Sequence, residues 1–221
     1  MAALPRTLPA MGWLLYAGIA QATPVVDQQF TPSGNFARLA VANDRTQIQT
    51  FTVGITGTLT SIDVRVSEGS QTVEDLVLSL WSTNAAGLPQ TQLAAHSVAP
   101  TDPAFAPPGS VALVPFDLTA AAVPVTAGEF LAIELNSNAS NNPPFDQRYE
   151  WEIGGQYDRG AAYTQMGTRI FALTDDFHFV DFVNPAPEPG TLVLLSTGLA
   201  GLLAYGRRRV RQRDFGAGRH L

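Results

Sequence analysis

The sequence predicts an all-β protein whose central part is an antiparallel β-sandwich with a jelly-roll order of strands. Apolar and polar residues alternate over many short stretches between residues 47 and 183, and a period of two is typical of strands that bury one face. Gly, Pro and Asn lie between these stretches, where turns are expected. No stretch of this part repeats its apolar residues with the 3.6-residue period of a helix. About eight to ten strands at this spacing favour the jelly roll.

The composition allows one core and limits the chemistry. The chain has 221 residues, of which 45% are hydrophobic, enough for one domain of ordinary size with extra segments at its ends. It contains no Cys, which excludes a disulfide scaffold, a thiolate metal site and a Cys nucleophile. Residues 23–187 carry 6 Arg against 17 acidic residues, a net charge of −11, whereas residues 207–221 carry 6 Arg and one Asp, a net charge of +5. The acidic central part repels a phosphate backbone, so nucleic acid is not expected as a partner.

The clearest strand signal lies in residues 47–66. Aliphatic and charged side chains alternate there in the order Ile62, Asp63, Val64, Arg65 and Val66. This order places the aliphatic side chains in the core and the charges in water. Gly54 and Gly57 bracket a turn earlier in the same segment.

Five more strands are predicted along the chain. They are residues 76–81, 111–118, 130–135, 149–153 and 177–183. Pro115 moves the second of them to an edge or a bulge, because proline donates no ladder hydrogen bond. In the fourth, Tyr149, Trp151 and Ile153 alternate with two glutamates, so the aromatic rings are predicted to face the core.

The N-terminus has the order of regions found in secretory signal peptides. A basic residue, Arg6, precedes the uncharged and mostly apolar residues 10–20, and a small-x-small triplet ends at Ala22. We predict cleavage by signal peptidase after Ala22, with Ala20 and Ala22 as the recognised small residues, so that residues 1–22 form a signal peptide. A buried N-terminal helix is the alternative, since the apolar run is too short to span a bilayer comfortably.

A second apolar run covers residues 191–205 and is followed at once by basic residues. The run has no charge and includes six Leu; as a helix it would be about 22 Å long, against a hydrocarbon core of ~30 Å. The basic residues are Arg207, Arg208, Arg209, Arg211 and Arg213. By the positive-inside rule they hold their end of the helix in the cytoplasm, which predicts a transmembrane helix with the body outside. A buried core helix with a solvated basic end is the alternative.

A proline-rich spacer joins the body to this apolar run. Residues 184–190 read NPAPEPG, and most of them neither extend a helix nor donate properly to a sheet. Glu188 lies between Pro187 and Pro189 in a stiff, extended stretch of backbone. A processing enzyme can reach such a backbone.

The spacer, the apolar run and the arginine cluster together resemble a PEP-CTERM sorting signal, with Pro187, Glu188 and Pro189 as its sorting motif. The resemblance covers residues 185–213. It implies a bacterial exported protein that is recognised and processed by an exosortase, a transpeptidase-like enzyme of the membrane. It also implies association with the cell surface, exopolysaccharide and the biofilm matrix.

The body is similar to choice-of-anchor β-domains, which are bacterial exported modules found on several alternative anchors. The similarity lies in residues 49–53, 57–64, 84–89, 157–163 and 176–179. It implies a β-sandwich and no particular activity.

No catalytic residue is predicted, and the protein is not expected to be an enzyme. The body holds His96 and His178 but no G-x-S-x-G elbow, and a Ser-His-Asp triad is recognised by geometry rather than by sequence. His178 is predicted to pack or pair on a strand face. Glu150 and Glu152 lie about 7 Å apart on one face, a separation that suits a glycosidase pair, but a solvated strand face is the favoured interpretation.

No cofactor and no metal ligand is predicted, although Ca²⁺ is a low-ranking option. Asp175, Asp176 and Asp181 offer oxygen ligands, yet no loop has EF-hand spacing, and surface acidity is the favoured interpretation. Aromatic residues that could stack on sugars are Trp81, Tyr149, Trp151, Tyr157 and Tyr163. Core packing is favoured for this set, and the polar loop 136–144 is the better candidate for a ligand-facing edge.

These observations divide the chain into a signal peptide (1–22), an exported β-sandwich domain (23–184), a sorting signal (185–213) and a short tail (214–221). We predict a non-enzymatic protein that crosses the inner membrane, is held there as a precursor through residues 191–205, and reaches the cell surface or extracellular matrix. Its expected partners are signal peptidase, an exosortase and exopolysaccharide. A carbohydrate-binding module for matrix polysaccharide is the alternative function; a secreted hydrolase would need an acid, base or metal cluster that the sequence does not reveal.

Overall fold

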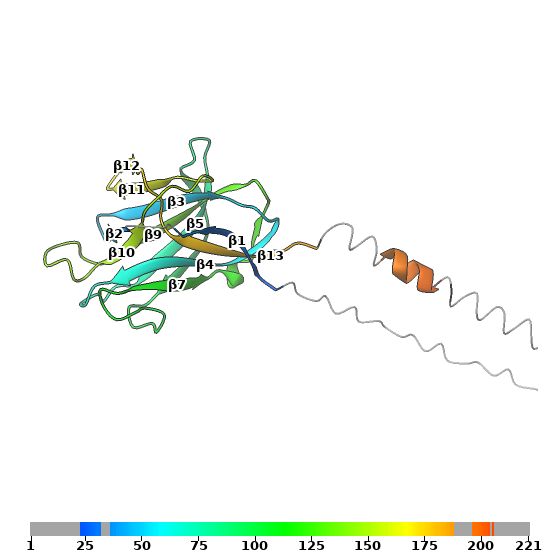
Figure 1. The fold of residues 1–221 in the computed structure, drawn as a ribbon, viewed down its shortest axis with the longest axis horizontal. Helices are drawn as coiled ribbons and strands as arrows, with labels where there is room; N and C mark the ends of the chain where they lie inside the picture. The colour runs from blue at the N-terminus through cyan, green and yellow to red at the C-terminus, as the bar shows by residue number, and fades with distance from the viewer. Residues whose placement is uncertain (1–22, 32–35, 188–195, 204, 206–221) are drawn as a thin grey trace, which may run out of the picture.

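Two antiparallel sheets packed face to face form the body of the protein (Figure 1). The computed structural model describes residues 23–31, 36–187, 196–203 and 205. The strands of this part are β1 (Val25–Phe30), β2 (Ala37–Val41), β3 (Thr46–Thr52), β4 (Gly57–Glu68), β5 (Leu76–Thr83), β6 (Pro89–Val98), β7 (Val111–Asp117), β8 (Val123–Val125), β9 (Phe130–Asn136), β10 (Tyr149–Ile153), β11 (Ala162–Met166), β12 (Arg169–Ala172) and β13 (Phe179–Pro185). A 3-10 turn, Thr119–Ala121, lies between β7 and β8.

The long strand β4 organises the first sheet. Along one edge of β4, residues 57–64 pair with β13 and residues 66–68 pair with β10; along the other edge β4 pairs with β8 and β7. β1 extends the sheet beyond β13, and β2 extends it beyond β10. The sheet therefore has four rows: β1 with β2, β13 with β10, β4, and β7 with β8.

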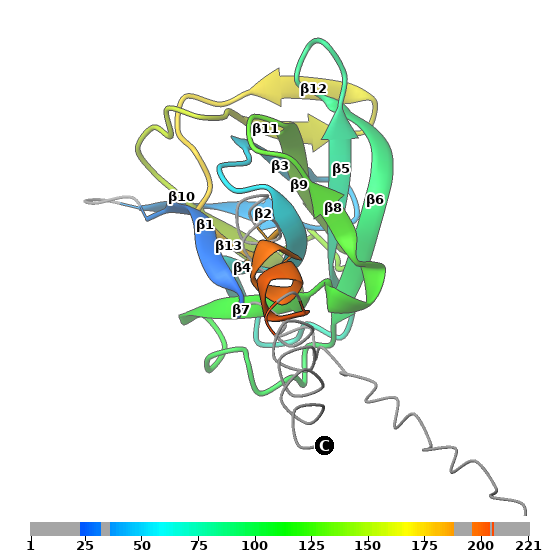
Figure 2. The same ribbon diagram turned by 90° about the vertical axis from the view of Figure 1, so that its right-hand side faces the viewer.

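The second sheet has the order β12-β11-β3-β9-β5-β6, and Figure 2 shows β11 and β12 at its outer end. Its four rows other than β12 and β11, namely β3, β9, β5 and β6, contribute buried side chains to the core that they share with the first sheet. Along the chain, β4 belongs to the first sheet, β5 and β6 to the second, β7 to the first, β9 to the second and β10 to the first. Two four-row antiparallel sheets joined by such crossings form a jelly roll, so the predicted fold class is confirmed.

The predicted alternations fill the space between the sheets. Ile62, Val64 and Val66 of β4 are fully buried, whereas Asp63 and Arg65 between them are partly exposed. Three alternate residues of β9 are also fully buried: Leu131, Ile133 and Leu135. Burial of each such side chain stabilises the fold by about 1.5–3 kcal/mol before entropy is counted. The core therefore follows from the period-two pattern of the sequence.

The body has more strands than the sequence predicts. The thirteen strands in the described residues exceed the expected eight to ten because several edge strands bury too little to show an apolar alternation. All four residues of β12 are exposed, and β6 is exposed over most of its length. Among the described strands, β7, which contains Pro115, pairs only with β4 and is an edge strand, as predicted.

Both ends of the body lie at one end of the sandwich. Val25 of β1 pairs with Val183 of β13, and Pro185 pairs with Gly57 at the start of β4. Glu68, at the other end of β4, lies about 36 Å away at the usual rise of a strand. The loops before β5, β7 and β10 gather there, since these strands pair in register with that end of the sandwich.

Candidate functional site

The predicted sorting motif begins where the last strand ends. β13 runs to Pro185, the Ala186 N–H donates to the Thr56 carbonyl oxygen at 2.9 Å, and Pro187 is exposed. The other residues predicted for the signal-peptidase site, the sorting motif and the basic cluster lie outside the described ranges: Ala20, Ala22, Glu188, Pro189, Arg207, Arg208, Arg209, Arg211 and Arg213. The first proline of the motif thus follows directly on the last residue held by the sandwich.

A short helix lies within the predicted transmembrane segment. Residues 196–203 are helical and exposed (orange in Figure 1). Leu199, Leu202 and Leu203 expose 49%, 71% and 61% of their surface. In the described part of the chain, no helix is both long enough and apolar enough for a membrane crossing. The helix presents leucine side chains that the sandwich core does not cover.

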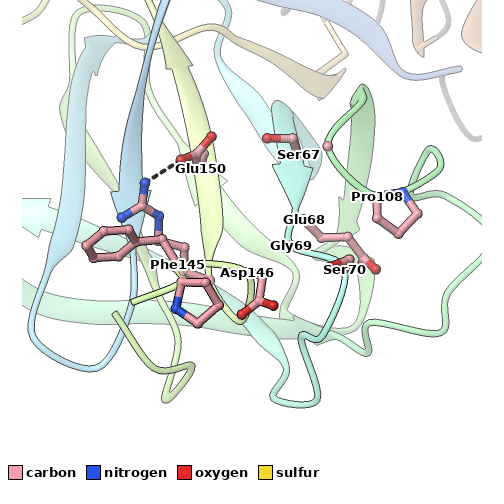
Figure 3. A pocket seen from close by; sticks show the side chains of 11 residues that line it. Ser67, Glu68, Gly69, Ser70, Pro108, Phe145, Asp146 and Glu150 are labelled. Carbon is pink, nitrogen blue, oxygen red and sulfur yellow. Dashed lines mark hydrogen bonds and ion pairs between the residues drawn. The ribbon is translucent and has the colours of Figure 1, made fainter. Parts of the chain in front are cut away.

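A pocket of about 320 Å³ opens at the far end of β4. Figure 3 shows Phe145 and Glu150 on one side of it and Ser67 and Pro108 on the other. Three chain segments line it: residues 67–70, residues 108–109 and the segment 144–150, in which Gln147 and Tyr149 do not reach the pocket. Loop backbone therefore forms much of the wall, and strands β4 and β10 support it from behind.

Backbone hydrogen bonds hold these three segments together. The Gly109 N–H donates to the Glu68 carbonyl oxygen at 2.9 Å, and the Gly69 N–H donates to the Arg148 carbonyl oxygen at 2.9 Å. A Cβ atom at Gly69 would overlap the Asp146 carbonyl oxygen, so only glycine permits this close approach. The shape of the pocket is therefore fixed by backbone as well as by side chains.

Phe145 and Arg148 form the polar–aromatic wall of the pocket. Phe145 has a φ of 66° and exposes 47% of its surface. The Arg148 guanidinium carbon lies 4.8 Å from the centroid of the Phe145 ring. Arg148 also donates to Glu150 at 2.6 Å and to Asn141 at 2.9 Å. The Nη1 and Nη2 atoms of the guanidinium thus donate to protein groups, whereas its Nε has no partner among the described residues, and nearly half of the Phe145 surface is exposed.

The pocket carries an excess of carboxylates. Glu68, Asp146 and Glu150 line it together with a single cationic side chain, Arg148. The Glu68 Oε2 atom is shielded from solvent and has no hydrogen-bond partner among the described residues. Partial burial raises the pKa of Glu68, because a carboxylate is less well solvated there. The lining of the pocket is thus acidic, with three carboxyl groups against one guanidinium.

The sequence singled out one loop that borders this pocket and missed the other segments. The loop 136–144, predicted as a ligand-facing edge, contributes Pro144 to the pocket. Phe145 follows directly, and an aromatic residue after two prolines in a polar loop is a signal that could have been used. Glu68 could not be found in the same way, since its role depends on which loops meet at the end of β4.

The predicted aromatic candidates pack elsewhere. Tyr149 and Trp151 are fully buried, as predicted. The Trp151 ring stacks on Phe177 at a centroid distance of 4.3 Å, and its Nε1 donates to the His178 carbonyl oxygen at 2.8 Å. Trp81, Tyr157 and Tyr163 are half-buried. None of these five rings lines the pocket at the end of β4.

The two glutamates of β10 have separate environments, and one corrects the sequence interpretation. Glu150 is half-buried at the pocket, where it pairs with Arg148. Glu152 is only 4% exposed and pairs with the Arg65 Nε at 2.7 Å. The prediction of a solvated strand face is wrong for Glu152, because its side chain is buried beside Arg65 and His178.

His178 has polar partners, as predicted, but it lies directly before β13 rather than within a strand. It is 5% exposed, its Nε2 lies 3.2 Å from the Thr31 hydroxyl oxygen, and its Nδ1 lies 3.6 Å from Glu152 Oε2. Burial, followed by the charge of Arg65, lowers its pKa. The order hydroxyl, imidazole, carboxylate is that of a hydrolase triad, but 3.6 Å is too long for a hydrogen bond. The contacts fit a structural network that balances the buried Glu152.

The three aspartates considered for Ca²⁺ do not act together. Asp175 is exposed, but Asp176 is 6% exposed and accepts from Gln49 Nε2 at 2.9 Å and from the Tyr157 N–H at 2.8 Å. Asp181 is fully buried. Surface acidity is therefore the wrong interpretation for Asp176 and Asp181. Within the described ranges, no group of three or more His, Cys, Asp or Glu side chains is placed to hold a metal ion.

Comparison with solved structures finds chains of infectious bursal disease virus. A structure of the Gt strain matches with 18% identity and a TM-score of 0.35 over 81% of this chain and 43% of the viral chain. A VP2 subviral particle matches with 15% identity and a TM-score of 0.30 over 94% of this chain and 59% of the viral chain. The chain thus spans about half the length of these viral chains. None of the curated proteins compared with the chain matches it.

Comparison with protein-family models identifies the C-terminal region. The model described as the PEP-CTERM protein-sorting motif matches residues 185–209, a range that includes the predicted Pro187, Glu188 and Pro189. This motif implies an exported precursor, anchored in the membrane and processed by an exosortase. The similarity of the body to choice-of-anchor domains stays a prediction. The chain carries a PEP-CTERM protein-sorting motif over residues 185–209, C-terminal to a body that folds as an antiparallel β-sandwich.

Proposed function

We propose that the protein is a non-enzymatic component of the bacterial cell surface or extracellular matrix, exported as a precursor and cut by an exosortase. The match of the sorting motif to residues 185–209 carries this proposal. Residues 191–205 would hold the precursor in the bilayer, and the arginine cluster behind them would set its depth and orientation. The processed body would carry the net charge of −11 found in residues 23–187.

The geometry of the body supports this use of its C-terminus. Pro187 is exposed two residues after the end of β13, so an enzyme can approach the spacer without opening the sandwich. The exposed leucines of helix 196–203 are the kind of surface that lipid or a membrane enzyme covers. A link to exopolysaccharide and biofilm belongs to the same proposal.

Mass spectrometry of the protein from its native host tests the sorting step. We expect a mature C-terminus upstream of Arg207 and an N-terminus at Thr23. The variant Glu188→Ala should accumulate with its C-terminus intact, whereas Glu74→Ala, a change at an exposed glutamate of the body, should be processed normally. A wild-type protein that remains intact through Leu221 would contradict the proposal.

A second function, carbohydrate binding, is favoured by one specific observation. The pocket at the end of β4 combines an exposed phenylalanine with several carboxylates, and aromatic faces with nearby acceptors suit sugar rings and their hydroxyl groups. The pocket lies about 36 Å along β4 from the end where the chain leaves for its anchor. Calorimetric titration of the protein with oligosaccharides tests this function separately from processing.

A further inference from the structure

The geometry points to the class of sugar that the pocket would take. We infer that the pocket formed by residues 67–70, 108–109 and 144–150 binds an amino sugar, a pyranose with an ammonium group, in preference to neutral sugars and above all to acidic ones. This inference rests on the carbohydrate-binding function proposed above. It makes the charge of the pocket the feature that selects the ligand.

The aromatic part of the pocket can hold the ring of a sugar. Phe145 exposes 47% of its surface, while Arg148 covers one face of its ring at 4.8 Å. The cation over one face and the hydrogen bonds from the same guanidinium to Glu150 and Asn141 restrict the movement of this wall. A wall that is already ordered loses little entropy when a ligand binds. The volume of about 320 Å³ lies at the small end of ligand pockets, which suits one sugar unit of a chain.

The polar part of the pocket offers acceptors and negative charge. Glu68, Asp146 and Glu150 outnumber Arg148, and the hydrogen bonds of Arg148 are already directed at protein groups. Glu150 is paired with Arg148, which leaves Glu68 and Asp146 as the lining carboxyl groups without an ion pair among the described residues. An ammonium group supplies three donors and a compensating charge. A uronate or a phosphate would instead meet two uncompensated carboxylates, and like charges repel.

Calorimetric titration of the full-length chain in detergent, at low salt and at a pH where the amine is protonated, tests the inference. The probes are β-1,4-linked hexamers of glucosamine, glucose and mannuronate. We expect the glucosamine hexamer to bind about tenfold more tightly than the glucose hexamer, and the mannuronate hexamer to bind most weakly. Hexalysine controls for attraction of any polycation to the acidic body.

Variants locate the effect in the pocket. Glu68→Gln keeps the shape of the side chain and removes its charge, so it should reduce the preference for glucosamine; Asp146→Asn is a second such variant in case the first does not fold. Asp175→Asn removes one exposed charge outside the pocket and should leave the affinities for the hexamers unchanged. Phe145→Ala should weaken binding of the glucosamine and glucose hexamers at least about tenfold. Phe171→Ala, at a ring with 46% exposure on β12, should leave the affinity for both hexamers unchanged.

Each outcome decides between the two claims. If the mannuronate hexamer binds as tightly as the glucosamine hexamer or more tightly, the inference is overturned, but the carbohydrate-binding function stays in place. Hexalysine binding as tight as that of the glucosamine hexamer, insensitive to Phe145→Ala, overturns the inference as non-specific charge attraction. If no hexamer binds, the carbohydrate-binding function fails together with the inference. None of these results bears on exosortase processing.

Discussion

Replacement of Asp181 by asparagine should stabilise the body at neutral and alkaline pH. Asp181 lies on β13 between Phe179 and Val183, which face the core, and it is fully buried. Its Oδ1 accepts from the Gln28 N–H at 2.8 Å, but its Oδ2 is buried without a partner in the described part of the chain. Burial, followed by the negative charge of Asp27, raises the pKa of Asp181 to about 8.

The raised pKa fixes the sign and the size of the effect. In the unfolded chain the carboxyl group has its ordinary pKa of 3.8. Between about pH 4 and about pH 8 the unfolded chain has therefore lost a proton that the folded chain retains, and the free energy of unfolding falls as the pH rises. For one proton, the free energy of unfolding falls by about 1 kcal/mol per pH unit, and by about 5 kcal/mol over the whole window. The asparagine side chain introduced by Asp181→Asn would carry no charge at any of these pH values.

Urea denaturation at several pH values, followed by tryptophan fluorescence, measures the effect. The core cluster lies wholly between Val41 and Val183, so residues 23–187 are the unit to unfold. Wild type and Asp181→Asn should have similar stability near pH 4 and diverge toward pH 8, where the variant is more stable by several kcal/mol. Asp175→Asn, at an exposed position, should follow the wild type. A separation between Asp181→Asn and wild type that does not change with pH would refute the reasoning.

Three further changes test the packing of the sandwich by the same denaturation assay. Trp151→Ala should lower the free energy of unfolding by about 3–5 kcal/mol, since the ring is fully buried; a loss below about 1 kcal/mol would mean that the site is not packed. Gly160→Ala should cost at least about 2 kcal/mol, because a Cβ there would overlap the Thr50 carbonyl oxygen, and wild-type stability would contradict this contact. Glu152→Gln should cost about 1–3 kcal/mol by leaving Arg65 without its ion-pair partner, and adding Arg65→Met should recover part of the loss.

The alternating strands were predictable because a local rule decides their burial. Ile62, Val64 and Val66 needed only the period of two, and so did Trp151. The same rule, applied from Phe177 through Phe179 to Val183, would also have placed Asp181 inside, since alternate residues of a strand share a face. The sequence interpretation placed Asp181 at the surface because its side chain is acidic, and it did not apply the period of two to this residue.

The residues missed by the sequence depend on contacts between distant segments. Glu152 is buried beside Arg65 of β4 and His178, which precedes β13, and no local pattern encodes a contact between three separate segments. The pocket needs Glu68, Pro108 and Phe145 from three loops brought together by strand register. The sorting motif is the opposite case, because an enzyme reads it as a linear segment and its chemistry does not require a fold.

The separation of the two proposed sites along β4 makes their functions independent. Gly57, at one end of β4, pairs with Pro185, beside the start of the sorting signal, whereas Glu68, at the other end, lines the pocket. About 36 Å of strand lies between them, far beyond the reach of direct contacts and beyond the ~10 Å screening length of surface charge. Glu68→Gln should therefore leave C-terminal processing unchanged, and Glu188→Ala should leave the affinity for the glucosamine hexamer unchanged. If Glu68→Gln altered C-terminal processing, or Glu188→Ala altered the affinity for the glucosamine hexamer, the two ends of the sandwich would have to communicate through the core. A rigidly packed jelly roll does not predict such communication.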